Sequence, residues 1–196
     1  MAKWAKDSGE VSIKIAVVGQ TGSGKSSILR DLATSHGQAS VRMATLSEAE
    51  VTRTEFIWPE PITDGPFVHV RVFALSGQPR HQAAEQLVLA GADGMVFVVD
   101  CDPRYIAASR DSLLAMMANA SHVGVDWGKM VVVMQYNRAE RYPHLQPQEL
   151  DKWLGIEDGK VARFITSSTR KDDLGVAVND VVKKVIARLT EQASMA

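Results

Sequence analysis

Short apolar runs rich in β-branched residues alternate along this chain with longer amphipathic stretches. Apolar runs of four to eight residues are typical of strands, and apolar positions three and four residues apart are typical of helices. The pattern predicts strands at residues 11–18, 54–58, 67–74, 94–101, 129–136 and 161–166. It predicts helices at residues 25–35 and 104–120, and a final helix whose apolar face carries Val178, Val181, Val182, Val185, Ile186 and Leu189.

Alternating strands and helices predict an α/β fold, a mostly parallel sheet with helices on both faces. The strands at 54–58 and 67–74 are joined by a turn at 59–66, which contains Asp64-Gly65-Pro66, so they should form one antiparallel edge pair. Residues 37–53 are polar and aperiodic and are expected to form a loop. In such sheets ligands bind outside the carboxyl ends of the strands, so functional residues are expected there.

Composition narrows the class of protein. The 196 residues suit one domain, 1–196, with an ordered core at about 12–190. The 22 basic and 23 acidic residues nearly cancel, which argues against a mainly electrostatic nucleic-acid binder. One cysteine, no apolar N-terminal segment and no lipidation motif at either end favour a cytoplasmic protein without a covalent membrane anchor.

The strongest motif is GQTGSGKS, which fits G-x-x-x-x-G-K-[ST] between a predicted strand and a predicted helix. Glycines there permit positive φ angles, so that main-chain N–H groups and the helix N-terminus can cradle a phosphate. Lys25 should reach the β- and γ-phosphates, and the Ser26 hydroxyl should bind Mg²⁺. We call residues 19–26 the phosphate loop; with the next residue, its candidate nucleotide contacts are Gly19, Gln20, Thr21, Gly22, Ser23, Gly24, Lys25, Ser26 and Ser27.

Three further segments carry a family resemblance. FALSGQPRHQAAEQLVLAGADGMVFVVD (73–100) resembles the switch II region, helix and next strand of Ras- and Arf-like small GTPases. VTRTEFIWPE (51–60) resembles the switch I region, and MVVVMQYNRAE (130–140) the guanine-recognition segment, of the bacterial gliding-motility GTPase (MglA) family. The resemblance implies the P-loop small-GTPase fold, with a six-stranded sheet, one antiparallel edge strand and five helices.

The resemblance also implies roles in hydrolysis. Gln78 matches the glutamine that orients the attacking water, and the N–H of Gly77 would contact the γ-phosphate. Thr54 matches the switch I threonine that binds Mg²⁺ and the γ-phosphate. Arg53 matches an arginine finger supplied in cis, although a solvated surface arginine is an equal alternative. Arg42 and Arg80 are rivals for the finger role.

For the base, the resemblance implies contacts from Asn137, Arg138, Glu140 and Ser167. The family element N-K-x-D reads Asn137-Arg138-Ala139-Glu140 here. A carboxylate that accepts from the guanine N1–H and 2-amino groups would reject adenine, and Glu140 keeps this charge with a longer reach. A second departure is Ala74, which stands where most small GTPases carry a magnesium-linked aspartate, so weaker Mg²⁺ binding is expected.

The sequence therefore predicts a GTP- and Mg²⁺-dependent molecular switch that hydrolyses GTP slowly to GDP. By resemblance, a roadblock-type (MglB-like) partner would activate it, effectors would contact its switch loops, and its role would be bacterial polarity or motility. Two alternatives stay open, a nucleotide-dependent binding module with little hydrolysis and a small-molecule kinase. The kinase alternative is the weaker one, because the sequence contains no evident arginine-rich lid for an acceptor substrate.

Overall fold

All the strands belong to one twisted sheet. The computed structural model describes residues 3–4, 11–37, 41–44, 50–58, 67–75, 82–156, 161–167, 169–170 and 174–194. The sheet order is β3-β4-β5-β2-β6-β7-β8, and β1 pairs with β2 outside this path. The strands are β1 (Lys3–Trp4), β2 (Val11–Val18), β3 (Val41–Ala44), β4 (Glu50–Trp58), β5 (Val68–Leu75), β6 (Gly94–Asp100), β7 (Val131–Asn137) and β8 (Ala162–Ile165).

Six of these strands form the predicted small-GTPase sheet. β5, β2, β6, β7 and β8 run parallel to their neighbours in that order, and β4 pairs antiparallel with β5. The α/β fold class and the antiparallel pairing of β4 with β5 are therefore confirmed, although β3 and not β4 is the strand at that edge of the sheet. Two short strands are additional: β1 is antiparallel to β2, and β3 is antiparallel to β4.

The prediction of a loop at residues 37–53 is wrong in two places. Residues 41–44 form β3, and β4 begins at Glu50 rather than at residue 54. Val41 pairs with Arg53 and Ala44 pairs with Glu50, so pairing between β3 and β4 accounts for the extended conformation of both segments. Hydrophobic periodicity describes neighbouring positions in the sequence, so it could not show that residues 41–44 pair with β4. The predicted turn at residues 59–66 lies outside the described residues.

Five α-helices are present in the described residues, as the family resemblance implied. They are α1 (Lys25–Ser35), α2 (Gln82–Leu89), α3 (Ile106–His122), α4 (Pro147–Leu154) and α5 (Val176–Ser194), with short 3-10 turns η1 (Pro103–Tyr105) and η2 (Ala139–Arg141). α1 coincides with its predicted bounds, whereas the predicted helix at 104–120 is split between η1 and α3. α4 was not individually predicted. It is delimited by Pro147 at its first turn and by Gly155 in the left-handed region.

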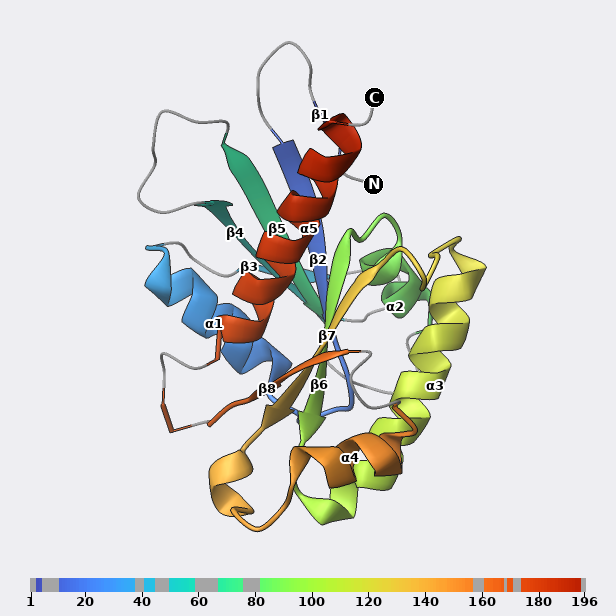
Figure 1. The fold of residues 1–196 in the computed structure, drawn as a ribbon. Helices are drawn as coiled ribbons and strands as arrows, with labels where there is room; N and C mark the ends of the chain where they lie inside the picture. The colour runs from blue at the N-terminus through green and yellow to red at the C-terminus, as the bar shows by residue number, and fades with distance from the viewer. Residues whose placement is uncertain are drawn as a thin grey trace.

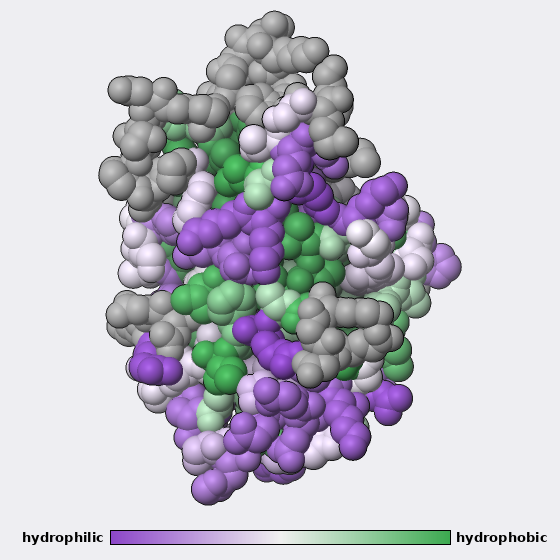
Figure 2. Space-filling model, in the orientation of Figure 1, coloured by the Kyte–Doolittle hydropathy of each residue, from purple (hydrophilic) through white to green (hydrophobic). Residues whose placement is uncertain are grey.

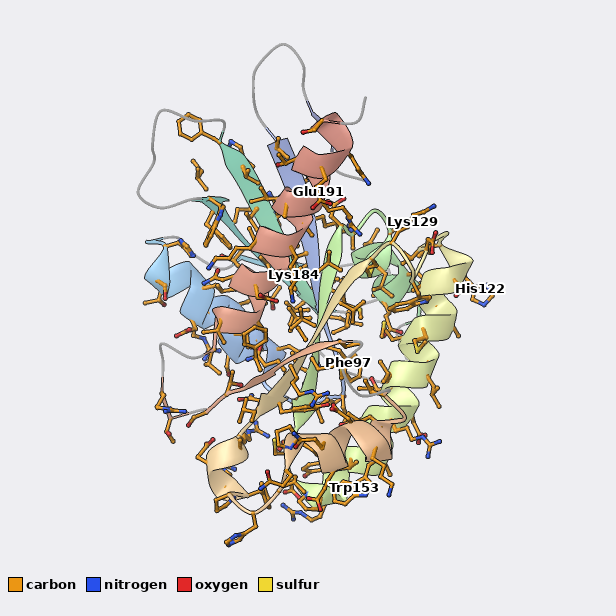
Figure 3. All side chains as sticks on the ribbon, viewed as in Figure 1. Phe97, His122, Lys129, Trp153, Lys184 and Glu191 are labelled. Atoms are coloured by element: carbon orange, nitrogen blue, oxygen red, sulfur yellow. The ribbon has the colours of Figure 1, made fainter. Side chains whose placement is uncertain are left out.

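The helices cover both faces of the sheet (Figure 1). α1 and α5 pack on one face, where Ile28, Leu29, Val178 and Val181 join the first apolar core. α2, α3 and α4 pack on the other face over a second core that contains fully buried Phe97 (Figure 3). Every residue of β6 is buried, as expected for a central parallel strand covered on both faces.

The surface over α5 is mainly hydrophilic, with hydrophobic residues beside it (Figure 2). In Figure 3 Trp153 lies on α4 at the bottom of the molecule and Lys129 at its right side, whereas Lys184 and Glu191 lie on α5 in front of the sheet. No helix within the described ranges has both the length and the apolarity to cross a membrane. β6 and β7 point their carboxyl ends to the lower edge in Figure 1, where β2 leads into α1. The candidate site is built at this edge.

Candidate functional site

The phosphate loop follows β2 without an intervening residue and leads directly into α1. Gly19, Gly22 and Gly24 have φ angles of 133°, 79° and 107°, which residues with a Cβ rarely adopt. α1 begins at Lys25 with no side-chain cap at its N-terminus. The first-turn N–H groups of such a helix are open to an external anion.

Two glycines of the loop allow close contacts with neighbouring strands. A Cβ on Gly19 would lie 2.2 Å from the carbonyl oxygen of Val98 in β6. A Cβ on Gly24 would lie 2.2 Å from Nδ2 of Asn137, at the end of β7. The main-chain oxygen requires a glycine at position 19, whereas at position 24 a Cβ would displace the Asn137 amide and strain a φ of 107°.

Lys25 is folded over the loop that precedes it. Its Nζ donates to the carbonyl oxygens of Gly19 at 2.8 Å and Gln20 at 2.7 Å, and the residue is 4% exposed. Burial lowers the pKa of the Lys25 ammonium to about 8, opposed by the nearby charge of Glu85. The ammonium is thus held at the centre of the loop, where a phosphate oxygen would replace a carbonyl as acceptor.

The rest of the loop leaves main-chain donors open. The described residues supply no hydrogen-bond partner for the N–H groups of Thr21, Gly22 and Lys25. The N–H of Ser27 is already bonded to Gly24 O at 3.0 Å, and the Ser23 side chain is fully buried. The open N–H groups and the exposed Ser26 hydroxyl are therefore better placed to meet an external anion than the buried Ser23 side chain or the bonded N–H of Ser27.

The predicted base-binding residues meet the phosphate loop at the same edge. Asn137, 2% exposed, donates from Nδ2 to Ser23 O at 2.8 Å. The N–H of Ala139 donates to Thr166 O at 3.3 Å, which joins the segment after β7 to the one after β8. Ser167 lies next in the chain, 4% exposed, with its Oγ 2.7 Å from Oγ1 of Thr169. The structure thus brings Asn137 and Ser167 to the edge that holds the phosphate loop.

Arg138 and Glu140 occupy the tight turn after β7. Arg138 has a φ of 61°, and its guanidinium forms an ion pair with the buried carboxylate of Asp100 at the end of β6. Glu140 is exposed in η2. The turn therefore presents Glu140 to solvent while Asp100 fixes the Arg138 head group.

β4 holds Thr54 and Arg53 away from the loop. Thr54 pairs with Val72, which pairs with Ile15, three residues before the end of β2 and thus about 10 Å below the sheet edge. Its Oγ1 is buried and has no partner among the described residues. Arg53 forms an ion pair with Glu55 and lies 5.8 Å from the centroid of the Phe73 ring. Neither side chain contacts the phosphate loop in this arrangement.

The remaining predicted switch residues cannot be placed. Gly77, Gln78 and Arg80 lie outside the described residues, and of Arg42 only its place in β3 is described. The parts of the chain that are described contain no group of three or more His, Cys, Asp or Glu residues suited to a metal. Ala74 is 1% exposed in β5.

Several contacts to the site were missed from the sequence. The Ser109 hydroxyl of α3 donates to the Gln20 side chain at 3.3 Å. Glu85 of α2 accepts from Nδ2 of Asn119 at 2.5 Å, and burial raises the pKa of its carboxyl. The only sequence signal for these residues is a polar side chain on a helix face that should be apolar. Asp102 caps η1, next to Asp100, and its carboxylate accepts from the N–H of Arg104 at 3.0 Å.

Comparison with known proteins agrees with this geometry. The chain is 27% identical over 181 residues to the mutual gliding-motility protein MglA of Myxococcus xanthus, and the match covers 90% of this chain and 89% of that protein. No family model matches the chain. The predicted resemblance to the Ras-like small GTPases, and among them to MglA, is confirmed.

Proposed function

We propose that this chain is a small GTPase similar to MglA, a molecular switch that binds GTP and hydrolyses it to GDP and phosphate. The observation that carries the proposal is the contact between two halves of one site. Asn137, the candidate guanine ligand, donates to Ser23 O inside the phosphate loop at 2.8 Å. A base held by the β7 turn would therefore have its phosphates over the open N–H groups of the loop.

The proposed roles follow from position and charge. Lys25 moves its Nζ hydrogen bonds from loop carbonyls to the β- and γ-phosphates and stabilises the charge that develops during phosphoryl transfer. Asn137, Ser167 and Glu140 contact the guanine, and the stem of Arg138 covers it while Asp100 holds its head group. Gln78 orients the attacking water, and the N–H of Gly77 contacts the γ-phosphate.

The residues present fit a magnesium ion only in part. Ser26 is exposed at the first turn of α1, where its hydroxyl suits a cation next to the phosphates. The orphaned Thr54 hydroxyl is the second candidate ligand, and it requires β4 to rearrange toward the sheet edge when GTP binds. Mg²⁺, when bound, would neutralise phosphate oxygens. With Ala74 in β5, we expect the GDP form to hold it weakly.

Arg53 is the proposed finger, in competition with Arg42 and Arg80. In the described arrangement Glu55 neutralises the Arg53 guanidinium. The side chain of Arg53 is 37% exposed and that of Glu55 is 46% exposed, so water weakens the ion pair. The pair therefore opposes release of the Arg53 guanidinium only weakly. The finger role thus requires the same rearrangement of β4 as the Thr54 ligand.

The biological setting rests on likeness to MglA alone. We propose that the protein acts in the cytoplasm, that a roadblock-type partner accelerates hydrolysis, and that effectors bind the segments around Thr54 and Gly77. Motility or polarity is the proposed process.

Single-turnover hydrolysis of GTP tests the proposal. We expect slow release of phosphate by the purified protein, on the order of 10⁻⁴ to 10⁻² per second, as for unassisted switches. Gln78→Leu should slow release by about tenfold or more while leaving GDP affinity within about twofold, because water positioning acts in the chemical step and not in binding. A matched control is Gln148→Leu, on the exposed side of α4.

A second function remains if hydrolysis is absent. Thr54 lies away from the loop, Arg53 is paired with Glu55, and Ala74 replaces a metal-linked carboxylate. These observations favour a nucleotide-dependent binding module. Tight GTP binding with no phosphate release, alone or with a roadblock-type partner, would establish the module and contradict the hydrolytic switch.

A further inference from the structure

A buried glutamine lies in the middle of the sheet just before the base-binding turn. Gln135 of β7 is 0% exposed in the run VVVMQYN, whose other residues before Tyr136 are apolar. Its Nε2 donates to the hydroxyl of Thr166 at 3.1 Å and to the carbonyl of Leu174 at 3.1 Å. The Leu174 carbonyl can only accept, which fixes the orientation of the Gln135 amide.

The two acceptors belong to the two ends of one segment. Thr166 directly follows β8, and Leu174 stands two residues before α5. The candidate base contact Ser167 begins the stretch between them. One side chain of β7 therefore fastens both ends of the segment that carries Ser167 to the sheet.

The same amide is linked to the phosphate loop. The Thr166 hydroxyl accepts from Gln135 and has its own proton to donate, to Asn137 Oδ1 or to Tyr136 O, each at 3.4 Å. Asn137 in turn donates to Ser23 O at 2.8 Å. Gln135, Thr166, Asn137 and Ser23 thus form a continuous buried chain through the three segments proposed to bind nucleotide.

This arrangement is not what stability alone favours. Oε1 of Gln135 is buried and has no hydrogen-bond partner among the described residues. A buried acceptor without a partner costs stability, and an apolar side chain in a covered parallel strand would avoid that cost. The position of the amide relative to the base-binding residues accounts for a polar group here.

We propose that Gln135 is a positioning residue that sets the base selectivity of the site. It acts through Thr166 on the orientation of the Asn137 amide and through both anchors on Ser167, without touching nucleotide itself. The inference rests on the proposed guanine-binding function. It predicts that losing the Gln135 amide weakens recognition of the base and spares the grip of the phosphate loop on the diphosphate.

The test compares GDP and ADP affinities of the wild type and Gln135→Met, a substitution that keeps the length of the side chain and removes its donors. We expect GDP affinity to fall by about tenfold, the effect of losing one to two well-placed hydrogen bonds, and ADP affinity to change by less than about twofold. The ratio of the two affinities is the decisive readout, because general loosening of the fold would weaken both nucleotides together.

A second pair of variants keeps the test decisive if Gln135→Met does not fold. Thr166→Val removes the hydroxyl that links Gln135 to Asn137, and Thr166→Ser keeps it. Thr166→Val should lower the GDP-to-ADP ratio by about fivefold or more, since one buried hydrogen bond is lost, and Thr166→Ser should keep the wild-type ratio. Equal ratios in all folded variants, or equal losses for both nucleotides, would overturn the inference. A wild type that binds GDP no better than ADP would instead contradict the proposed function, and the inference with it.

Discussion

Replacing Lys25 with methionine is expected to weaken binding of GDP and GTP by about 100-fold or more. The ammonium is the one charged donor that the structure holds inside the phosphate loop, 2.8 Å from Gly19 O and 2.7 Å from Gln20 O. Charged hydrogen bonds contribute about 1.5–3 kcal/mol each, and two of them to phosphate oxygens correspond to roughly two orders of magnitude or more in affinity. Titration calorimetry measures the loss.

The matched control is Lys129→Met. Lys129 has 81% of its side chain exposed and pairs with Asp126 in the loop before β7, away from the phosphate loop. That variant should bind both nucleotides as the wild type does. A Lys25→Met protein that retains affinity within about threefold would contradict the assignment of this loop to phosphate binding.

The same lysine predicts a pH dependence. Because burial lowers the pKa of Lys25 to about 8, the unliganded protein loses this charge as the pH rises from about 8, and GDP affinity should fall over that range. The unfolded chain keeps its proton up to an ordinary pKa of 10.5, so it binds more protons than the folded state between about 8 and 10.5. The contribution of Lys25 to the free energy of unfolding should therefore increase with pH in that window.

Both pH effects should disappear in Lys25→Met. They are measured by GDP titration and by urea unfolding of nucleotide-free protein at a series of pH values from 7 to about 10.5. An affinity profile that is the same in the wild type and in Lys25→Met would contradict the proposed role of the buried ammonium.

Gly19→Ala is expected to have the largest effect on folding. The new Cβ would lie 2.2 Å from a main-chain oxygen, Val98 O, which belongs to the central strand β6 and cannot rotate away. Its φ of 133° adds backbone strain. Strain of about 1–3 kcal/mol and overpacking of about 1–3 kcal/mol together predict a loss of roughly 2–6 kcal/mol in the free energy of unfolding.

Gly22→Ala separates the clash from the strain. Gly22 also has a positive φ, 79°, but a Cβ there would meet nothing within 4 Å. Gly22→Ala should lower the free energy of unfolding by about 1–2 kcal/mol, because only the left-handed conformation is unfavourable for alanine there. Chemical denaturation of the two nucleotide-free variants measures the difference. Equal losses would mean that the close approach of the loop to β6 does not constrain the fold.

The parts of the fold that could be predicted from sequence are those whose signal is local. α1 was placed to the residue because the phosphate loop, the apolar positions Ile28, Leu29 and Leu32 and the stop at Gly37 all lie within one short stretch. β6 and β7 were found because their runs are almost continuously apolar, and β5 because apolar and polar positions alternate along it. β3 was missed because its extended form depends on pairing with β4, which its own residues do not signal.

The residues of the candidate site can also be separated into those that a local motif identifies and those that it does not. The phosphate loop and Asn137 were recognisable from motifs, and the structure brings them together. The contacts that hold the base-binding turn could not be recognised from motifs, because their partners are far apart in the sequence. Asp100 and Arg138 are separated by 38 residues, and Gln135 and Leu174 by 39. A motif records which residues face a ligand, whereas the partners that orient them come from distant strands and become visible only in the fold.

Comparing GDP and ADP binding by calorimetry in the presence of Mg²⁺ tests the central claim, that this edge of the sheet holds a guanine nucleotide by its base and its phosphates. The account predicts that nucleotide-free protein binds GDP at least about 100-fold more tightly than ADP, since a site built to hydrogen-bond a group strongly rejects an analogue without it. Equal affinities for the two nucleotides, or no binding of either at millimolar concentration, would contradict it.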